Sequence, residues 1–203
     1  MSSRDEIFAS IRANRPKVKR PLPAVPLFDA PWPASLLAAF KESLEQMGGI
    51  FLEAPAAGDR LAPVRAKIAN AKVVCSTVPE IAGNRDIAGV RAPQGVADVD
   101  FAIVRAAFAV AETGSVLLSD RELRVNAVAY LAQHLIVLLD PADIVVNLHH
   151  AYRRPEFRNR HYAAFHTGPS ATADIEGVLI HGAQGVRSLS VLPLARAQSP
   201  STN

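Results

Sequence analysis

Cysteine is almost missing from this sequence. Cys75 is the single cysteine among 203 residues. One cysteine cannot form an internal disulfide, and alone it cannot hold an iron–sulfur cluster or a structural zinc ion. We therefore expect a chain without a cluster of its own, and the scarcity of cysteine agrees with a cytoplasmic location.

Long hydrophobic runs are missing as well. Apolar runs such as residues 135–139 are far too short to cross a bilayer. Arg4, Asp5 and Glu6 are followed by no apolar segment of the kind that a signal peptide has. Because 49% of the residues are apolar and 20% are charged, we expect a cytoplasmic globular protein with one substantial core and no membrane span.

The sequence also lacks a recognisable metal or nucleotide motif. His149 and His150 are adjacent, so on a helix their side chains would point about 100° apart and would not share one ion. His134 begins an apolar run, where a hydrogen-bonded structural role is expected. Gly182 and Gly185 lack the strand-to-helix context of a dinucleotide fingerprint. We expect no metal site and no cofactor.

Positive charge is concentrated in the first 20 residues. That segment holds six Lys and Arg residues against two carboxylates, whereas the rest of the chain holds 16 against 17. Three interpretations stay open for the basic arm: a solvated tail, docking to an acidic partner, and nucleic-acid binding. Because Phe8 is its single aromatic residue, stacking on bases is poorly supported, and we expect no nucleic-acid partner.

The chain divides into four parts. Ser2 or Ser3 can cap a helix over residues 4–14, which carries one apolar stripe made of Ile7, Phe8 and Ile11. So short a helix is marginal alone and needs a surface to pack on. Six prolines then predict an extended linker. The expected parts are an N-terminal amphipathic helix (1–15), a proline-rich linker (16–33), a globular domain (34–197) and a disordered tail (198–203).

Within the globular part, strand and helix patterns alternate. Strands are expected at 50–52, 72–76, 101–104, 107–111, 116–118, 134–139, 162–166, 178–180 and 189–192. Helices are expected at 36–47, from Asp59 or Pro63 to about Asn70, at 126–132, at 142–152 and from Thr172 onward. The first strand, helix and strand predict a crossover unit with parallel strands. The order indicates an α/β fold.

The turn Ala111-Glu112-Thr113-Gly114-Ser115 lies between two of these strands. Gly114 permits a positive φ or a close approach by a ligand. Glu112 follows a buried strand, and three roles stay open for it: nucleophile or base, ligand contact, and hydrogen-bond acceptor that fixes the turn. Glu112 is the candidate catalytic residue.

A second stretch, from Gly168 to Glu176, has similar ingredients. The first amides of the expected helix would lack intrahelical partners, so Ser170 and Thr172 either cap it or bind a small carboxylate or phosphate. Asp174 would repel such an anion unless a cation or proton intervened, and it suits simple capping. The candidate ligand-binding residues are Glu112, Thr113, Gly114, Ser115, Gly168, Ser170, Thr172 and Asp174.

Several segments together resemble the LUD-domain family. The matching residues are 111–115, 134–137, 168–170, 172–176, Gly182, Gly185, Leu189 and Val191, with Arg4, Ile7, Ile11 and Arg12 in the first helix. The resemblance runs from that helix to about Leu194. It implies a Rossmann-like open sheet with helices on both faces, like sugar-phosphate isomerases and CoA transferases, preceded by the N-terminal helix and linker.

The resemblance also implies a function. Within the family the chain is similar to the accessory, cluster-free subunit that works with two iron–sulfur partner subunits in the oxidation of L-lactate to pyruvate. It leaves open whether this subunit is itself an enzyme. The alternative is a stand-alone enzyme acting on a CoA-linked or phosphorylated small acid, with Glu112 as nucleophile or base.

Overall fold

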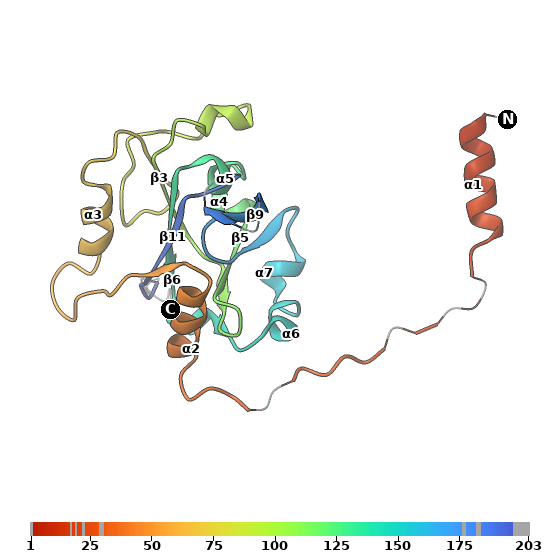
Figure 1. Ribbon diagram of the computed structural model, residues 1–203, viewed down its shortest axis with the longest axis horizontal. Helices are drawn as coiled ribbons and strands as arrows, with labels where there is room; N and C mark the ends of the chain where they lie inside the picture. Colours follow the sequence, from red (N-terminus) through yellow and green to blue (C-terminus); the bar gives the residue numbers. More distant parts are fainter. Residues whose placement is uncertain are drawn as a thin grey trace, which may run out of the picture.

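The computed structural model (Figure 1) describes most of the chain. The described residues are 2–16, 18, 20–21, 23–28, 31–175, 178–181 and 184–196. The expected tail at 198–203, Glu176 and Gly182 lie outside them. No helix in the described part is long and apolar enough to cross a membrane.

The core is built on a five-stranded parallel sheet. Its order is β1 (Ile50–Phe51), β11 (Ser188–Pro193), β6 (His134–Leu139), β3 (Phe101–Arg105) and β2 (Val74–Ser76). The Rossmann-like α/β architecture expected from the sequence is confirmed. The first two strands of the chain are parallel as predicted, but they occupy opposite edges of the sheet rather than neighbouring positions.

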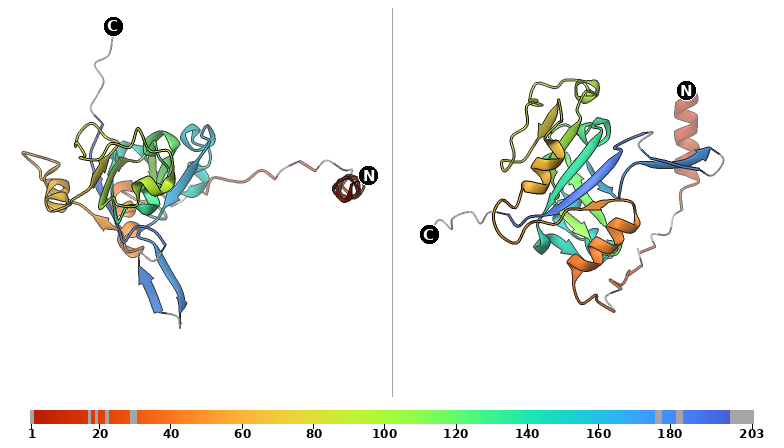
Figure 2. Two further views of the ribbon diagram at one scale, coloured as in Figure 1. Left: turned by 90° about the horizontal axis from the view of Figure 1, so that it is seen from above. Right: turned by 60° about the vertical axis from the view of Figure 1, so that its left-hand side comes forward.

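A second sheet carries the first glycine turn. Its order is β7 (Ile144–Val145), β4 (Phe108–Val110), β5 (Ser115–Ser119) and β8 (Ala163–His166). The β4–β5 and β5–β8 pairs are antiparallel, whereas β4 and β7 are parallel. A separate antiparallel hairpin, β9 (Ala171–Ile175) with β10 (Val178–His181), projects from the body in Figure 2. The sequence did not predict this division into sheets.

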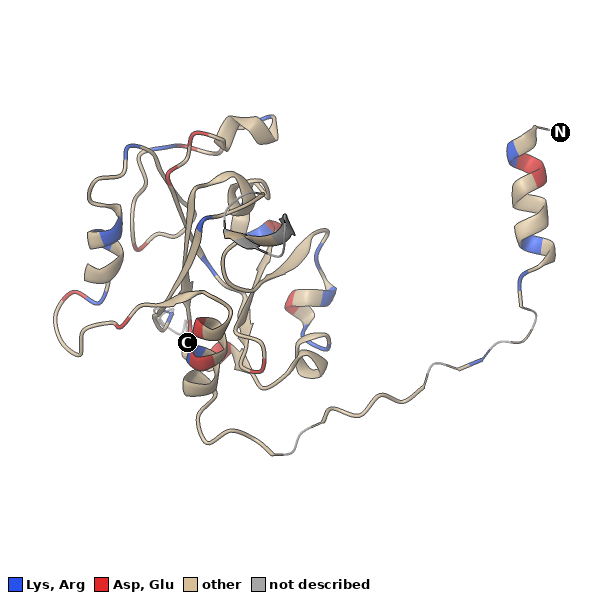
Figure 3. Cartoon of the chain, viewed as in Figure 1, with Lys and Arg blue, Asp and Glu red and all other residues tan. Residues whose placement is uncertain are grey.

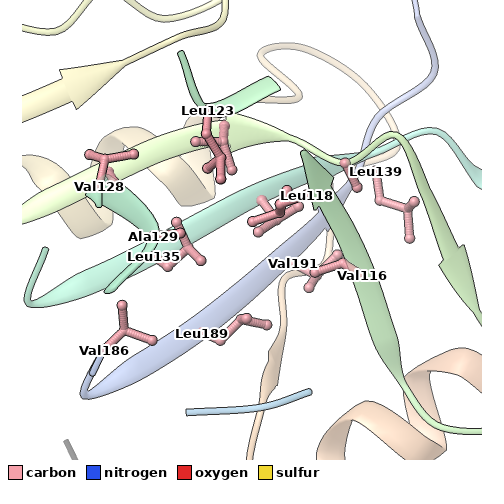
Figure 4. Packing of buried hydrophobic residues seen from close by; sticks show 14 of the residues in the cluster. Val116, Leu118, Leu123, Val128, Ala129, Leu135, Leu139, Val186, Leu189 and Val191 are labelled. Atoms are coloured by element: carbon pink, nitrogen blue, oxygen red, sulfur yellow. The ribbon is translucent and has the colours of Figure 1, made fainter. Parts of the chain in front are cut away.

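Different elements cover the two faces of the parallel sheet. The helical segments of the body are α2 (Leu36–Gln46), α3 (Ala62–Ile68), η1 (Pro93–Val96), α4 (Asp120–Leu123), α5 (Val128–Leu131), η2 (Pro141–Asp143), α6 (Leu148–Ala151) and α7 (Pro155–Arg158). One face of β6 packs with Val64 of α3. The other packs with α2, α5 and the inward side chains of β5, including Val116 and Leu118 (Figure 4). Helices therefore lie on both faces, and the second sheet completes one of the two layers.

Two expected helices are wrong. The segment 142–152 begins with the short helix η2, continues as β7 beside β4, and becomes helical again only at α6. The β-branched pair Ile144 and Val145 finds a strand partner, so tertiary pairing overrides the helical periodicity. The helix expected from Thr172 is strand β9, because its backbone pairs with β10.

The N-terminal helix forms as predicted. Helix α1 (Ser3–Ala13) begins at Ser2, whose hydroxyl and the Asp5 carboxylate form a capping box, and none of its residues is buried. In Figures 1 and 2 it lies away from the body. The domain limits at 15, 33 and 197 stay a prediction.

The end of the linker is bound to the body. The Asn147 amide donates hydrogen bonds to the carbonyls of Leu27 and Phe28, at 2.7 and 3.1 Å. The Phe28 ring lies 4.6 Å from the His149 ring, measured between centroids. Phe28 has a φ of +53°, which is unusual for a bulky side chain. These contacts attach the segment around Phe28 to α6.

Candidate ligand site

Both glycine turns are shaped by contact with helix α2. Gly114 has a φ of +66°, and a Cβ there would lie 2.3 Å from the backbone nitrogen of Leu44. Gly168 has a φ of +73°, and a Cβ there would lie 2.1 Å from the carbonyl oxygen of Met47. Two separate reasons therefore require glycine at each position: the positive φ, and the neighbouring backbone that occupies the place of a Cβ.

Glu112 joins the first turn to helix α6. Its carboxylate accepts a hydrogen bond from the backbone N–H of Leu148, the first residue of that helix, at 3.1 Å. Its own N–H donates to the carbonyl of Val146 at 3.0 Å, and its carbonyl accepts from the hydroxyl of Ser43 at 3.3 Å. These bonds support the interpretation in which Glu112 fixes the turn. The side chain is nevertheless exposed.

Three hydroxyl groups form a chain beside Glu112. Ser115 Oγ lies 2.7 Å from Thr113 Oγ1 and 2.6 Å from Thr167 Oγ1. Ser115 is only 3% exposed, so the middle of the chain is buried. Sequence reasoning selected Thr113 and Ser115 and missed Thr167. The pairing of β5 with β8 places Thr167 next to Ser115, because Val116 pairs with His166.

The hydroxyl chain opens into a cleft of about 580 Å³. The cleft lies between α2, the β4–β5 turn, α6 and β8. Its lining residues are Ser43, Gln46, Met47, Glu112, Thr113, Ser115, Leu148, Tyr152, Phe165 and Thr167. Glu112 is the single charged residue among the described residues of this lining. Apart from the hydroxyls, Gln46 and Glu112, the lining is apolar or aromatic.

The second predicted stretch lines a neighbouring pocket. Gly168 and Ser170 contribute to a pocket of about 250 Å³ that Tyr130 and His166 also line. The two pockets share Phe165 and Thr167. The two glycine turns therefore border adjacent pockets.

The strand at β9 changes what the second stretch offers. Thr172 and Asp174 belong to β9, so the free helix amides on which an anion site was expected do not exist there. The side chain of Asp174 lies outside the described part of the structure. The expectation of a small-anion site at this stretch thereby loses its structural basis.

His166 adds no charge to the neighbouring pocket at neutral pH. Burial lowers the pKa of His166 to about 4. Its Nε2 atom is buried and has no hydrogen-bond partner within the described residues. The ring lies 5.3 Å from that of Tyr130, measured between centroids. At neutral pH the imidazole is therefore neutral.

The remaining titratable groups that the structure describes do not assemble a metal site. In the described part of the chain, no three His, Cys, Asp or Glu side chains are placed to hold an ion. Cys75 is buried in β2, and burial raises the pKa of its thiol. His134 has the structural role expected for it, since its Nδ1 lies 2.8 Å from the hydroxyl of Ser188.

Comparison with known proteins agrees with this architecture. A crystal structure of a DUF162 family protein from Deinococcus radiodurans is similar, with a TM-score of 0.55 and 18% sequence identity. The match covers 77% of this chain and 94% of that one, and it shows the fold alone. No curated protein matches the chain. The model of the LUD domain matches residues 86–192, from before β3 through β11, and the chain therefore belongs to the LUD-domain family.

Proposed function

We propose that this chain is the accessory, cluster-free subunit of an iron–sulfur complex that oxidises L-lactate to pyruvate, in the role of lactate utilization protein C. Membership of the LUD-domain family supports a role in lactate utilization. The observation that carries the subunit assignment is helix α1, which is well capped and yet packs on nothing among the described residues.

The surface of α1 suits a partner protein. Ile7, Phe8 and Ile11 are 58%, 43% and 58% exposed. The helix has 11 residues, a length at which an isolated helix is marginal in water. Burying each of these side chains would contribute about 1.5–3 kcal/mol, so docking on the iron–sulfur subunits would stabilise the helix. In Figure 3 the start of α1 carries acidic residues beside a basic one, and its last turn carries a basic residue. The helix dipole favours the acidic residues at the start and the basic residue at the end.

The proposal includes a small-molecule site bordered by the turn 112–115 and the segment 168–174. The hydroxyl chain and the adjacent cleft support a site at the first turn. A carboxylate or phosphate ligand was expected from a helix at Thr172, and strand β9 removes that reason.

A stand-alone enzyme acting on a CoA-linked or phosphorylated small acid is the alternative function. The exposure of Glu112 at the cleft favours it, because a nucleophile or base must reach the substrate. One observation opposes it: the Glu112 carboxylate already accepts a hydrogen bond from the backbone N–H of Leu148. If the alternative holds, Glu112→Gln should abolish turnover of an acyl or phosphoryl substrate that the wild type converts.

The experiment for the subunit assignment is co-purification with the iron–sulfur subunits encoded in the same genome. Deleting residues 2–20 should abolish co-purification and leave the thermal unfolding of the body unchanged. Ile11→Asp should weaken the complex at least tenfold, because it places a charge in the apolar stripe. Ala9→Asp is the matched control, since residue 9 lies on the opposite side of the helix and should keep the complex. A complex that survives both the deletion and Ile11→Asp would contradict the proposal.

A further inference from the structure

We propose that the cleft beside the hydroxyl chain binds an uncharged ligand that has an oxygen acceptor at one end and a flat apolar body. The inference deepens the ligand site of the proposed function and does not depend on assembly with the partner subunits. Three observations support it: an unused hydroxyl donor, the charge of the lining residues, and the apolar, aromatic character of the rest of the lining.

The hydroxyl chain has one donor more than it can use internally. Thr113, Ser115 and Thr167 each carry one hydroxyl hydrogen, which makes three donors. The two contacts between them use two donors. No other described group accepts a hydrogen bond from these hydroxyls, and Ser115 is buried between the other two. One hydroxyl hydrogen therefore remains for a group in the cleft, such as a carbonyl or hydroxyl oxygen.

The lining does not favour an anion. Among the described residues, Glu112 is the single charged one in the lining, and neither Lys nor Arg lines the cleft. The nearby Leu148 amide is already bonded to the Glu112 carboxylate, so it is not free to bind an anion. A bound carboxylate would lose its hydration without gaining a cation and would lie near a like charge. A neutral acceptor avoids both costs.

Much of the remaining lining of the cleft is apolar and aromatic. Phe165 and Tyr152 meet edge to face, with ring centroids 6.1 Å apart. Met47 and Leu148 add to the apolar lining, and a methionine side chain adapts to ligands of varied shape. The volume of about 580 Å³ falls in the range of small-molecule sites. A ring-bearing molecule with one polar oxygen suits this combination of a hydroxyl chain and an apolar, aromatic lining.

Two probes of the same shape test the charge preference on the full chain. Benzamide and benzoate differ mainly in charge, and their binding is measured by NMR chemical-shift titration. Benzamide should perturb Thr113, Ser115, Thr167 and Phe165, and benzoate should bind about tenfold more weakly. Glu112→Gln should reduce this difference by strengthening benzoate binding. Equal or tighter binding of benzoate by the wild type would overturn the proposal, as would the absence of benzamide shifts in the cleft.

Two variants test the hydroxyl chain and the aromatic lining separately. Thr167→Val removes a hydroxyl while keeping the shape, and it should weaken benzamide about fivefold. Tyr152→Ser changes an exposed aromatic residue and should weaken benzamide without altering the fold. Thr77→Val, beyond strand β2, is the matched control and should bind benzamide normally. Unchanged binding by both Thr167→Val and Tyr152→Ser would overturn the assignment.

The outcome is separable from that of the proposed function. Thr167→Val should still co-purify with the iron–sulfur subunits, and Ile11→Asp should still bind benzamide. Loss of the complex without loss of benzamide binding would contradict the subunit role alone. Loss of benzamide binding with an intact complex would be expected of the cleft variants and of no other.

Discussion

The two glycine turns have similar sequences and different surroundings. Each combines a glycine at positive φ with neighbouring hydroxyl residues, and each presses on α2. The turn at Gly114 adds a carboxylate that caps α6 and borders a cleft. The turn at Gly168 follows a half-buried neutral histidine and leads into a projecting hairpin. What packs on a turn, more than its own residues, decides the chemistry that the turn offers.

The largest effect should come from filling the contact that the two turns share. Gly114→Ala and Gly168→Ala would each place a Cβ within about 2.3 Å of the α2 backbone at a positive φ. Each should lower the free energy of unfolding by about 3 kcal/mol or more, from left-handed strain plus overpacking. Urea denaturation measures this.

Gly58→Ala is the matched control for both variants. Gly58 also has a positive φ, of +86°, but a Cβ there meets nothing within 4 Å. Gly58→Ala should lower the free energy of unfolding by the backbone strain alone, about 1–2 kcal/mol. If Gly114→Ala costs no more than Gly58→Ala, the contact with α2 is not what requires glycine.

The next effect distinguishes the turns by pH. The pKa of His166 is about 4 in the folded protein, against about 6.5 in an unfolded chain. The unfolded state therefore binds more protons, and the stability contributed by neutral His166 is complete above pH 6.5 and is lost as the pH falls toward 4. The loss should reach about 3 kcal/mol at most.

Urea denaturation between pH 7 and pH 4 measures that loss. Removing the imidazole with His166→Leu should flatten the profile in this window. Glu112→Gln, at the other turn, should keep the wild-type histidine contribution. A wild-type profile that is already flat from pH 6.5 to pH 4 would contradict the burial argument for His166.

The smallest effect concerns the cap on α6. Glu112→Ala removes the acceptor of the Leu148 amide and should cost about 0.5–1.5 kcal/mol. Ser170→Ala, on the second turn, should change stability by less than about 0.5 kcal/mol, because no side-chain hydrogen bond holds Ser170 among the described residues. Thermal unfolding of the two variants measures this difference in stability. Equal losses of stability in Glu112→Ala and Ser170→Ala would contradict the capping role of Glu112.

The sequence predicted what depends on local pattern. The helix capped at Ser2, the helix over 36–47 and the apolar strand at 134–139 were expected and are present. Each carries its signal within a dozen residues, as caps and periodicity do. The Rossmann-like architecture followed from their order together with the family resemblance.

What failed depends on partners distant in the chain. The segment at Ile144 becomes a strand because β4 lies beside it, and Thr172 enters a strand because β10 folds back on it. Thr167 was missed for the same reason, since only the β5–β8 pairing brings it to Ser115. Within the site, the turn at Glu112 could be predicted from the sequence. The residues from distant parts of the chain that surround this turn could not.

The bond between Asn147 and the linker has a mechanical consequence. The Asn147 side chain accepts from the His150 amide, at the start of α6, while its amide holds Leu27 and Phe28. Asn147 therefore links the linker segment at Leu27 and Phe28 to α6, the four-residue helix that forms one wall of the cleft. Any tension that a bound partner exerts along the arm would be delivered to that helix first, before it reaches the sheets.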